Sequence, residues 1–413
     1  MTNSSPAPTA ATGAAHVPGE RLRVVHVIDS LAGSGGAENR LVDEVVGLVP
    51  RCDQTVVRLF ERDFLDARLA DAGVPVVALG FRAGRAGRTW PLVGHRLAGV
   101  LRELRPDVIH TSLFTGNLVG QLAGARLGVP VVSTFNRTGE SHLQRALQPG
   151  VASWKGRVMQ AVGRRAARLG DVHHRAVGEY ARRTNCASLG LPVEAATVVP
   201  RGVPIAPQAD APEGGRAAFG LPATGPLFAN VARLVPEKAQ HLLVAAFARV
   251  RDEVPGAHLA IAGAPGAASP AVEEAIERAG LSGAVSLLGF RPEARALVAA
   301  ADVFAFSSIS EGSPGAVVEA MVTGTPVAAF AIPPVAELTD GDAHAWLAEP
   351  GDVRALATAM LAAWQAPDGR ERAAATRAWA EQRYALPAVV ARLGDLLEAR
   401  AARRSSPRRR RRP

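Results

Sequence analysis

The stretch at 307–326, SSISEGSPGAVVEAMVTGTP, is the most informative part of this chain. It follows an apolar run at 302–306 that is typical of a buried strand, passes through a turn rich in Gly, Ser and Pro, and enters a helical pattern at about 314–323. Glu311 lies in the turn, and Glu319 lies eight residues later on the helix. A loop that opens a helix offers free backbone N–H groups and the positive end of a dipole, which suit anionic or hydroxyl-rich ligands. Two carboxylates beside those groups can accept hydrogen bonds from ligand hydroxyls; the alternative is a pair of solvated glutamates.

A second strand-to-helix junction carries two cations. A buried strand at 226–232 (PLFANVA) is followed by the loop RLVPEKA and by an amphipathic helix at 240–251. Arg233 and Lys238 stand in that loop, where the carboxyl end of a parallel strand faces the ligand crevice. A guanidinium fork and a compact ammonium at this spacing can clasp a diphosphate. Two ordinary surface cations are the alternative.

Strand and helix patterns alternate along the chain, which predicts an α/β fold with two doubly wound, Rossmann-like domains that face a cleft. The chain has 413 residues, more than a single core usually holds, and 48% of them are hydrophobic. A linker is indicated at 200–222, where five prolines and several glycines gather. Strand-like runs lie near 23–28, 55–60, 74–79, 107–110 and 130–134 in the first half and near 226–232, 258–262, 284–289, 302–306 and 325–330 in the second.

The net charge of +9 lies mostly at one end of the chain, because seven arginines stand in the last eleven residues. Such a tail is expected to be disordered, with its charges simply solvated; attraction to an anionic membrane surface by charge alone is the alternative. Aromatic residues make up 5% of the chain and are absent from the tail, so nucleic-acid binding is not expected. No apolar run reaches the length that spans a bilayer. Cys52 and Cys186 lack neighbours at metal-ligand spacing, so we expect neither zinc nor a disulfide, as in a reducing cytoplasm.

A glycine loop, Gly33-Ser34-Gly35-Gly36, follows the first strand and precedes a helix that begins near residue 37. Glycines let the backbone approach a ligand closely, and the helix start favours a phosphate. Glu38 occupies the place of the third glycine of a dinucleotide fingerprint, so the loop is not a clean match to that motif. A tight turn, with Glu38 complementing the helix dipole, is the structural alternative.

Taken in order, these segments resemble the group 1 glycosyltransferases, or glycosyltransferase family four, which are retaining enzymes of the GT-B fold. The matching pieces begin with VVHVIDSLAGSGGAENRLVDEVVGL at 24–48 and RPDVIHTSLFTGNLVGQLAGARLGVPVVSTFN at 105–136. They continue with VVPRGVP at 198–204, ARLVPEK at 232–238 and EGSPGAVVEAMVTGTPV at 311–327. The resemblance covers roughly residues 22–395, and it is specific for the family but not for its substrate.

The resemblance implies roles on the donor side. Arg233, Lys238 and Glu311 would be the catalytic residues, and the two cations would stabilise the leaving nucleoside diphosphate. Glu319 would hold the ribose hydroxyls, and Phe290 would contact the base. No metal and no cofactor are implied, since the nucleotide sugar is a co-substrate. The full donor-binding set is Gly35, Gly36, Arg233, Lys238, Phe290, Glu311, Gly312, Ser313, Pro314, Gly315, Ala316, Val317 and Glu319.

The acceptor side departs from the family pattern. Many members carry a histidine after the strand at 131–135, where this chain has Asn136, which can hydrogen-bond a hydroxyl but cannot titrate. The family's usual glycine pair before Glu337 is replaced by AIPPVAE, which leaves the role of that loop open. The acceptor-side candidates are Glu38, Ser112, Asn136 and His142.

The resemblance also assigns domains. We place a disordered lead at 1–20, an acceptor-binding domain at 21–200 and a donor-binding domain at 201–370. Helices at 371–402 return to the first domain, and an arginine-rich disordered tail occupies 403–413.

The sequence therefore predicts a cytoplasmic transferase that moves a hexose, with retention, from a nucleotide-diphosphate sugar to an acceptor hydroxyl. UDP is favoured by family frequency, and the acceptor class includes small molecules and lipid-linked or cell-envelope glycans. A basic amphipathic helix at 154–169 and the tail make peripheral contact with the inner face of an anionic membrane a further expectation. Two alternatives stay open: a nucleotide-sugar-binding partner subunit that has lost catalysis, and a nucleotide-sugar epimerase of the same fold.

Overall fold

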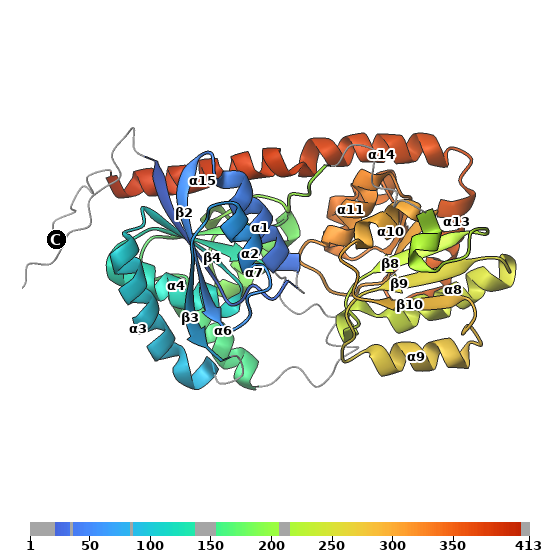
Figure 1. Ribbon diagram of the computed structural model, residues 1–413, viewed down its shortest axis with the longest axis horizontal. Coiled ribbons are helices and arrows are strands. Elements are labelled where there is room, and N and C mark those ends of the chain that lie inside the picture. Colours follow the sequence, from blue (N-terminus) through green and yellow to red (C-terminus); the bar gives the residue numbers. More distant parts are fainter. Residues whose placement is uncertain (1–20, 34–35, 83–85, 137–153, 206–214, 406–413) are drawn as a thin grey trace, which may run out of the picture.

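The computed structural model describes residues 21–33, 36–82, 86–136, 154–205 and 215–405. Two predicted site residues, Gly35 and His142, lie outside these ranges, as do the predicted lead and the arginine run of the tail. The described residues form two α/β halves, each built on one parallel sheet (Figure 1).

The sheet of the N-terminal half has seven strands in the order β3-β2-β1-β4-β5-β6-β7, and all of its pairings are parallel. The strands are β1 Leu22–Ile28, β2 Cys52–Phe60, β3 Val76–Phe81, β4 Val108–Ser112, β5 Val131–Phe135, β6 Val172–Ala176 and β7 Ala196–Val198. The helices are α1 Gly36–Leu48, α2 Asp66–Asp71, α3 Ala86–Leu104, α4 Phe114–Leu127, α6 Trp154–Ala166 and α7 Glu179–Leu189. This strand order reverses direction between β1 and β4, and ligands bind beyond the carboxyl ends of the strands at such a switch point.

The sheet of the C-terminal half has six parallel strands in the order β10-β9-β8-β11-β12-β13. The strands are β8 Leu227–Val231, β9 His258–Ala262, β10 Val285–Gly289, β11 Val303–Phe306, β12 Val327–Phe330 and β13 Trp346–Ala348. The helices are α8 Gln240–Glu253, α9 Ser269–Arg278, α10 Ala294–Ala300, α11 Gly315–Thr323, α12 Pro333–Leu338 and α13 Val353–Gln365. Its switch point lies between β8 and β11, the strands that precede the two loops singled out in the sequence.

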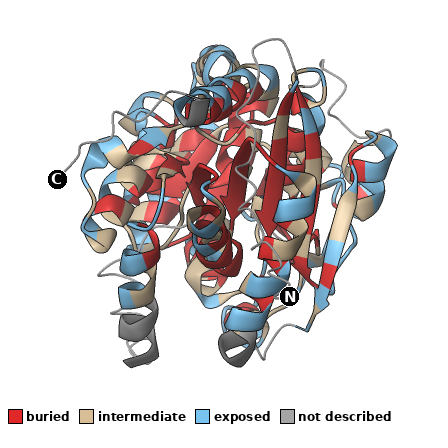
Figure 2. Ribbon diagram, turned by 90° about the vertical axis from the view of Figure 1, so that its left-hand side faces the viewer, coloured by how far each residue is buried: buried red, intermediate tan, exposed pale blue. Residues whose placement is uncertain are grey.

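Both sheets are covered by helices, which explains why their strands are runs of apolar residues rather than alternating patterns. Along β11, Val303 and Ala305 join the core cluster under α8 and α13, whereas Phe304 and Phe306 join the cluster under α11. In the N-terminal sheet the central strands β1, β4 and β5 are likewise buried, whereas the edge strand β3 is mostly not, and exposed residues lie on the outer helices (Figure 2). The two sheets confirm the predicted fold class.

The last two helices link the halves. Helix α14 (Gly369–Tyr384) packs against α11, and α15 (Leu386–Ser405) packs against α1 and β4, so that together they run along both halves (Figure 1). Between them the backbone of Leu386 donates to Val203 O at 2.9 Å, and Val203 donates to Tyr384 O at 2.8 Å. The chain therefore crosses between the halves twice at one place, through the segment after β7 and through the α14–α15 junction.

Strand patterns in the sequence do not predict β6, β7 or β13. Strand β6 reads VHHRA, with three polar residues in five, and its partners are supplied by the fold rather than by its own pattern. The other ten strands overlap the predicted runs; β9 matches its run at both ends, and the remaining boundaries differ by at most three residues.

Candidate active site

The two loops at the C-terminal switch point meet through an ion pair. Lys238 Nζ donates to Glu311 Oε1, and both side chains are mostly buried, with 18% and 12% of their areas exposed. Backbone contacts align the loops: Ile309 N donates to Glu237 O at 3.0 Å, and Ser307 Oγ donates to Lys238 O at 2.9 Å. The fold thus brings together a cation and a carboxylate that are separated by 73 residues in the sequence.

Arg233 lies in the same loop, directly after β8, with its side chain exposed. Its carbonyl accepts a hydrogen bond from Gln240 Nε2 at 3.0 Å, which fixes the loop to the start of α8. Among the described residues, no hydrogen-bond or ion-pair partner engages its guanidinium. Arg233 is therefore available to a ligand, whereas the ammonium of Lys238 is shared with Glu311.

The predicted helix with the second carboxylate begins at Gly315, one residue later than the pattern indicates. No side chain caps this helix start, and Pro314 precedes it with extended backbone. Ser313, in the turn before it, has a buried hydroxyl oxygen with no hydrogen-bond partner. Uncapped N–H groups and an unsatisfied hydroxyl suit the oxygen atoms of a phosphate or a sugar. The remaining members of the predicted turn, Gly312, Ala316 and Val317, lie on either side of this helix start.

Glu319 lies on the second turn of α11 and pairs with Arg201, whose Nη2 lies 3.2 Å from Oε1. Burial raises the pKa of Glu319 above its usual value, and the positive charges of Arg201 and Arg295 partly offset that rise. Phe290 follows β10 and is 52% exposed, as an aromatic surface for a base would be.

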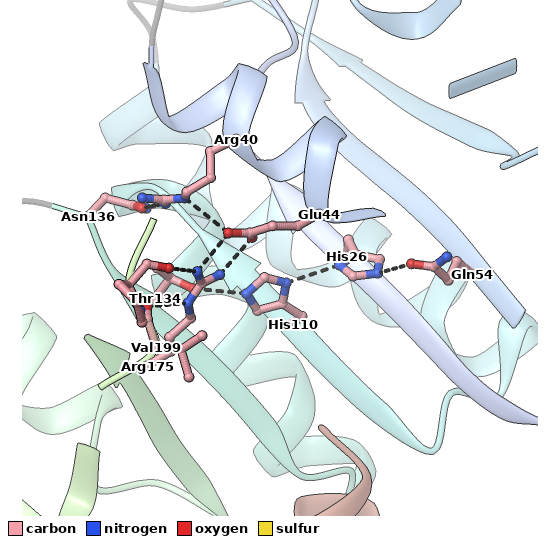
Figure 3. A network of polar contacts seen from close by, with 10 residues as sticks. His26, Arg40, Glu44, Gln54, His110, Thr134, Asn136, Arg175 and Val199 are labelled. Atoms are coloured by element: carbon pink, nitrogen blue, oxygen red, sulfur yellow. Dashed lines mark hydrogen bonds and ion pairs between the residues drawn. The ribbon is translucent and has the colours of Figure 1, made fainter. Parts of the chain in front are cut away.

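The N-terminal side of the cleft contains a buried ion network (Figure 3). Arg175, on β6, is fully buried and donates to both carboxylate oxygens of Glu44 at 2.6 Å each. The same guanidinium donates to the carbonyl oxygens of Val199 at 3.1 Å and Pro200 at 3.0 Å. The network therefore anchors the segment that leads from β7 into the C-terminal half. Although burial alone would raise it, the pKa of Glu44 is lowered by Arg175 and Arg40.

Arg40 joins this network from α1. Its Nε lies 3.6 Å from Glu44 Oε1, and its Nη2 donates to Asn136 Oδ1. Burial lowers the pKa of Arg40 to about 9, with like-charge repulsion from Arg175 and Arg201 adding to the effect and Glu44 opposing it. Asn136 thus follows β5 as expected but is engaged by an arginine, and its Nδ2 is buried without a partner.

Of the other acceptor-side candidates, Glu38 and Ser112 lie within the described residues. Glu38, in the first turn of α1, accepts a hydrogen bond from Ser30 Oγ at 2.7 Å. Ser112 is buried at the end of β4. These two residues and Asn136 follow β1, β4 and β5, so they line the switch point of the N-terminal sheet.

Two buried histidines extend from this site into the sheet (Figure 3). Gln54 Nε2 donates to Val45 O at 3.0 Å, so its Oε1 accepts from His26 Nε2 at 2.9 Å. His26 Nδ1 then accepts from His110 Nδ1 at 3.0 Å, which assigns one proton to each ring. Burial lowers the pKa of His26 to about 4 and also lowers the pKa of His110 well below its usual value, so both rings are neutral near pH 7.

Glu337 lies in α12 and contacts the other half of the chain. Both carboxylate oxygens of Glu337, in the C-terminal half, accept hydrogen bonds from backbone N–H groups at the start of α7, including that of Tyr180 at 2.8 Å. Glu337 thus caps a helix of the other half.

Sequence reasoning missed Arg201 and the Arg40–Glu44–Arg175 network. Arg201 lies within VVPRGVP, a segment whose match to the family was clear, but nothing local marks its partner, which lies 118 residues away. Arg175 and Glu44 are 131 residues apart. Within the described residues, no group of three or more potential metal ligands gathers, and none of the described helices is long and apolar enough to cross a membrane.

Two α/β halves with facing switch points define the GT-B class of proteins. The family model described as "Glycosyltransferase Family 4" matches residues 34–206, and the model described as "Glycosyl transferases group 1" matches residues 225–366. The chain belongs to the group 1 glycosyltransferase family.

Known relatives and structures agree with this assignment. The chain is 32% identical over 149 residues to a putative colanic acid biosynthesis glycosyltransferase of Escherichia coli. This match covers 34% of this chain and 36% of that protein. It is 30% identical over 281 residues to the 2-deoxystreptamine N-acetyl-D-glucosaminyltransferase of Streptomyces fradiae, covering 63% of each. The match therefore spans between about a third and two thirds of these relatives. The fold is similar to that of Anabaena HepE in complex with UDP-glucose, with a TM-score of 0.76, 22% identity, and coverage of 91% of this chain and 99% of that one.

Proposed function

We propose that this protein is a retaining, metal-independent glycosyltransferase that moves a hexose from a UDP-sugar to an acceptor hydroxyl. The observation that carries the proposal is the arrangement at the C-terminal switch point. There, exposed Arg233, the Lys238–Glu311 pair and the uncapped start of α11 converge beyond the ends of β8 and β11. Membership of the family and the UDP-glucose bound to the HepE fold support a UDP-linked donor.

The chemistry that these residues would perform follows from their charges. As the bond between the sugar and the diphosphate breaks, negative charge develops on the leaving diphosphate. Lys238 and Arg233 would stabilise that charge without moving far, since one ammonium is already held in the cleft and one guanidinium is unengaged. Glu311 would then exchange part of its contact with Lys238 for hydroxyls of the transferred sugar.

Retention would follow if the acceptor hydroxyl attacks from the face that the diphosphate leaves. The attacking oxygen forms the new glycosidic bond as the old bond to the diphosphate oxygen breaks, and the hydroxyl proton passes to the departing phosphate. The acceptor would enter from the N-terminal side, past Glu38, Ser112 and Asn136. We propose a lipid-linked or cell-envelope glycan as acceptor; a relative's name includes colanic acid biosynthesis.

The test is calorimetric binding of UDP, GDP, ADP and TDP, with EDTA present, followed by a transfer assay with the matching sugar nucleotides. We expect UDP to bind selectively and the anomeric configuration of the product, measured by NMR, to match that of the donor. Inversion of the anomeric centre would contradict retention, and a requirement for a divalent ion would contradict metal independence.

The two alternatives make different predictions in the same assays. A partner subunit without catalysis, for which the engagement of Asn136 by Arg40 is the only support, would bind UDP yet transfer nothing. An epimerase would convert the donor sugar in the absence of any acceptor. The predicted cytoplasmic location and membrane contact through the tail stay predictions, since the arginine run at 408–412 lies outside the described residues.

A further inference from the structure

Arg201 occupies an unusual position between the two halves. It belongs to the segment between β7 and the C-terminal half, and 16% of its side-chain area is exposed. A Cβ atom added to Gly36, the first residue of α1, would lie 2.8 Å from Arg201 Nη1. A Cβ atom added to Gly315, the first residue of α11, would lie 2.2 Å from the same nitrogen. The guanidinium therefore packs directly on the starts of two helices, one from each half, and only glycine leaves room for it at both.

The carboxylate of Glu319 is the one anion that Arg201 contacts among the described residues, and the rest of its surroundings disfavour a positive charge. Both helix starts carry partial positive charge, and so a guanidinium against them faces charge of its own sign. Arg40, which is 5% exposed, lies close enough for Arg201 to lower its pKa. The Nε atoms of Arg40 and Arg201 are both buried and have no hydrogen-bond partner. Arg40 Nε has the carboxylate of Glu44 at 3.6 Å, and Arg201 contacts Glu319 only through Nη2. Buried cationic nitrogens that lack hydrogen bonds, beside two helix starts, can donate to an oxyanion.

The contact that holds Arg201 is weaker than that of its neighbour in the network. Arg201 reaches Glu319 through one nitrogen at 3.2 Å, whereas Arg175 reaches Glu44 through two nitrogens at 2.6 Å each. The backbone before Arg201 is nevertheless fixed, because Arg175 donates to Pro200 O. Arg201 thus has an anchored main chain and a side chain that can change partner.

We propose that Arg201 is a third cation of the diphosphate site, held on Glu319 while the cleft is empty and transferred to a phosphate oxygen when the donor binds. This inference rests on the proposed function, in which Glu319 receives the ribose hydroxyls. Those hydroxyls compete with Arg201 for the carboxylate, and the released guanidinium then meets the phosphate beside the start of α11. Ribose binding and phosphate binding are coupled in this way by one side chain.

The test compares inorganic pyrophosphate, UDP and uridine by calorimetry, using the full-length protein and its Arg201→Gln, Arg201→Lys and Glu319→Gln variants. We expect Arg201→Gln to weaken binding of pyrophosphate and of UDP by roughly ten- to hundredfold, since a charge-assisted hydrogen bond is lost. Uridine, which has no phosphate, should bind at least as well to this variant. Arg201→Lys should retain more of the phosphate affinity than Arg201→Gln.

Glu319→Gln is the decisive variant, because it should change the affinities for pyrophosphate and for uridine in opposite directions. Because it releases Arg201 from its carboxylate, this variant should bind pyrophosphate more tightly than the wild type while it binds uridine more weakly. Arg278→Gln, on the exposed face of α9, is the matched control and should change none of these affinities. Circular dichroism and the Tm of each variant show whether it has folded.

The outcomes separate the two proposals. If the wild type binds UDP and Arg201→Gln binds both UDP and pyrophosphate just as tightly, this inference is overturned and the proposed function stands. Loss of pyrophosphate affinity in Arg201→Gln with unchanged UDP affinity also overturns it, because the anion would then come from a source other than the donor. Wild-type protein that binds pyrophosphate through Arg201 but no nucleotide supports the oxyanion site and contradicts the proposed donor. Failure to bind either ligand overturns both.

Discussion

The two sides of the cleft use arginine and lysine in opposite ways. On the N-terminal side, Arg175 and Arg40 are buried and share Glu44, and Arg175 also donates to two carbonyl oxygens. On the C-terminal side, Lys238 has one carboxylate partner and Arg233 is exposed. A buried cation whose donors are satisfied holds structure, because removing its partner leaves an uncompensated charge. A cation at a loop with spare donors is available to a ligand.

The largest effect on stability is expected from a substitution in the buried network of the N-terminal side. Glu44→Gln would leave Arg175 and Arg40 without their shared anion, and we expect it to lower the free energy of unfolding by about 3–5 kcal/mol. Urea denaturation measures this loss. Asp43→Asn is the matched control on the same helix, because the Asp43 side chain is 17% exposed and pairs with a 49% exposed Arg68, and partly exposed pairs contribute about 0–1 kcal/mol. Equal effects of the two substitutions would show that the network is not a structural element.

On the C-terminal side, substitution of a cation should reduce activity more than it reduces stability. Lys238→Ala removes a cation from the developing charge of the leaving group, and we expect kcat to fall by about 10²–10³-fold. The Tm should fall by less than in Glu44→Gln, because the carboxylate that loses its partner, that of Glu311, is 12% exposed whereas that of Glu44 is 1% exposed. Arg249→Ala, an exposed cation on α8, should leave kcat unchanged. Wild-type activity in Lys238→Ala would contradict the leaving-group assignment.

Buried His26, on the N-terminal side, should make the free energy of unfolding depend on pH. The unfolded chain binds a proton at His26 near pH 6.5, but the folded protein does so only near pH 4. Stability from this group is thus fully present above pH 6.5 and is lost as the pH falls through the folded value, about 3 kcal/mol in all. Urea denaturation between pH 7 and pH 4 measures the slope. His26→Gln should flatten it, and an unchanged slope in that variant would contradict a neutral, buried His26.

The sequence predicts features that depend on neighbouring residues better than features that depend on residues far apart in the chain. Strand runs followed by Arg233, Lys238 or Glu311 are local patterns, and the strand order then places all three at one switch point. Arg201 has no such local signal, because its role arises from Gly36 and Gly315 in different halves of the chain.

The same limit applies to the N-terminal network. The sequence predicts Asn136 as an acceptor-side residue from its place after a strand, but its partner Arg40 lies 96 residues away and is indistinguishable in the sequence from a surface arginine on a helix. Long-range ion pairs are chosen by packing, and the periodicity of a helix specifies only which face is apolar.

The smallest expected effect tests the edge of the donor site. Phe290 is half exposed, so replacing it with alanine should leave the free energy of unfolding within about 0.5 kcal/mol of the wild type. If its ring stacks on the base, UDP affinity should fall by about threefold to tenfold, as expected for loss of an aromatic contact. Leu287→Ala, an apolar change at a 39% exposed position on β10, should leave UDP affinity unaltered. Pyrophosphate affinity should be the same in both variants, because neither side chain carries charge. A Phe290→Ala protein that binds UDP as tightly as the wild type would remove this residue from the donor site while leaving the cations of the cleft in place.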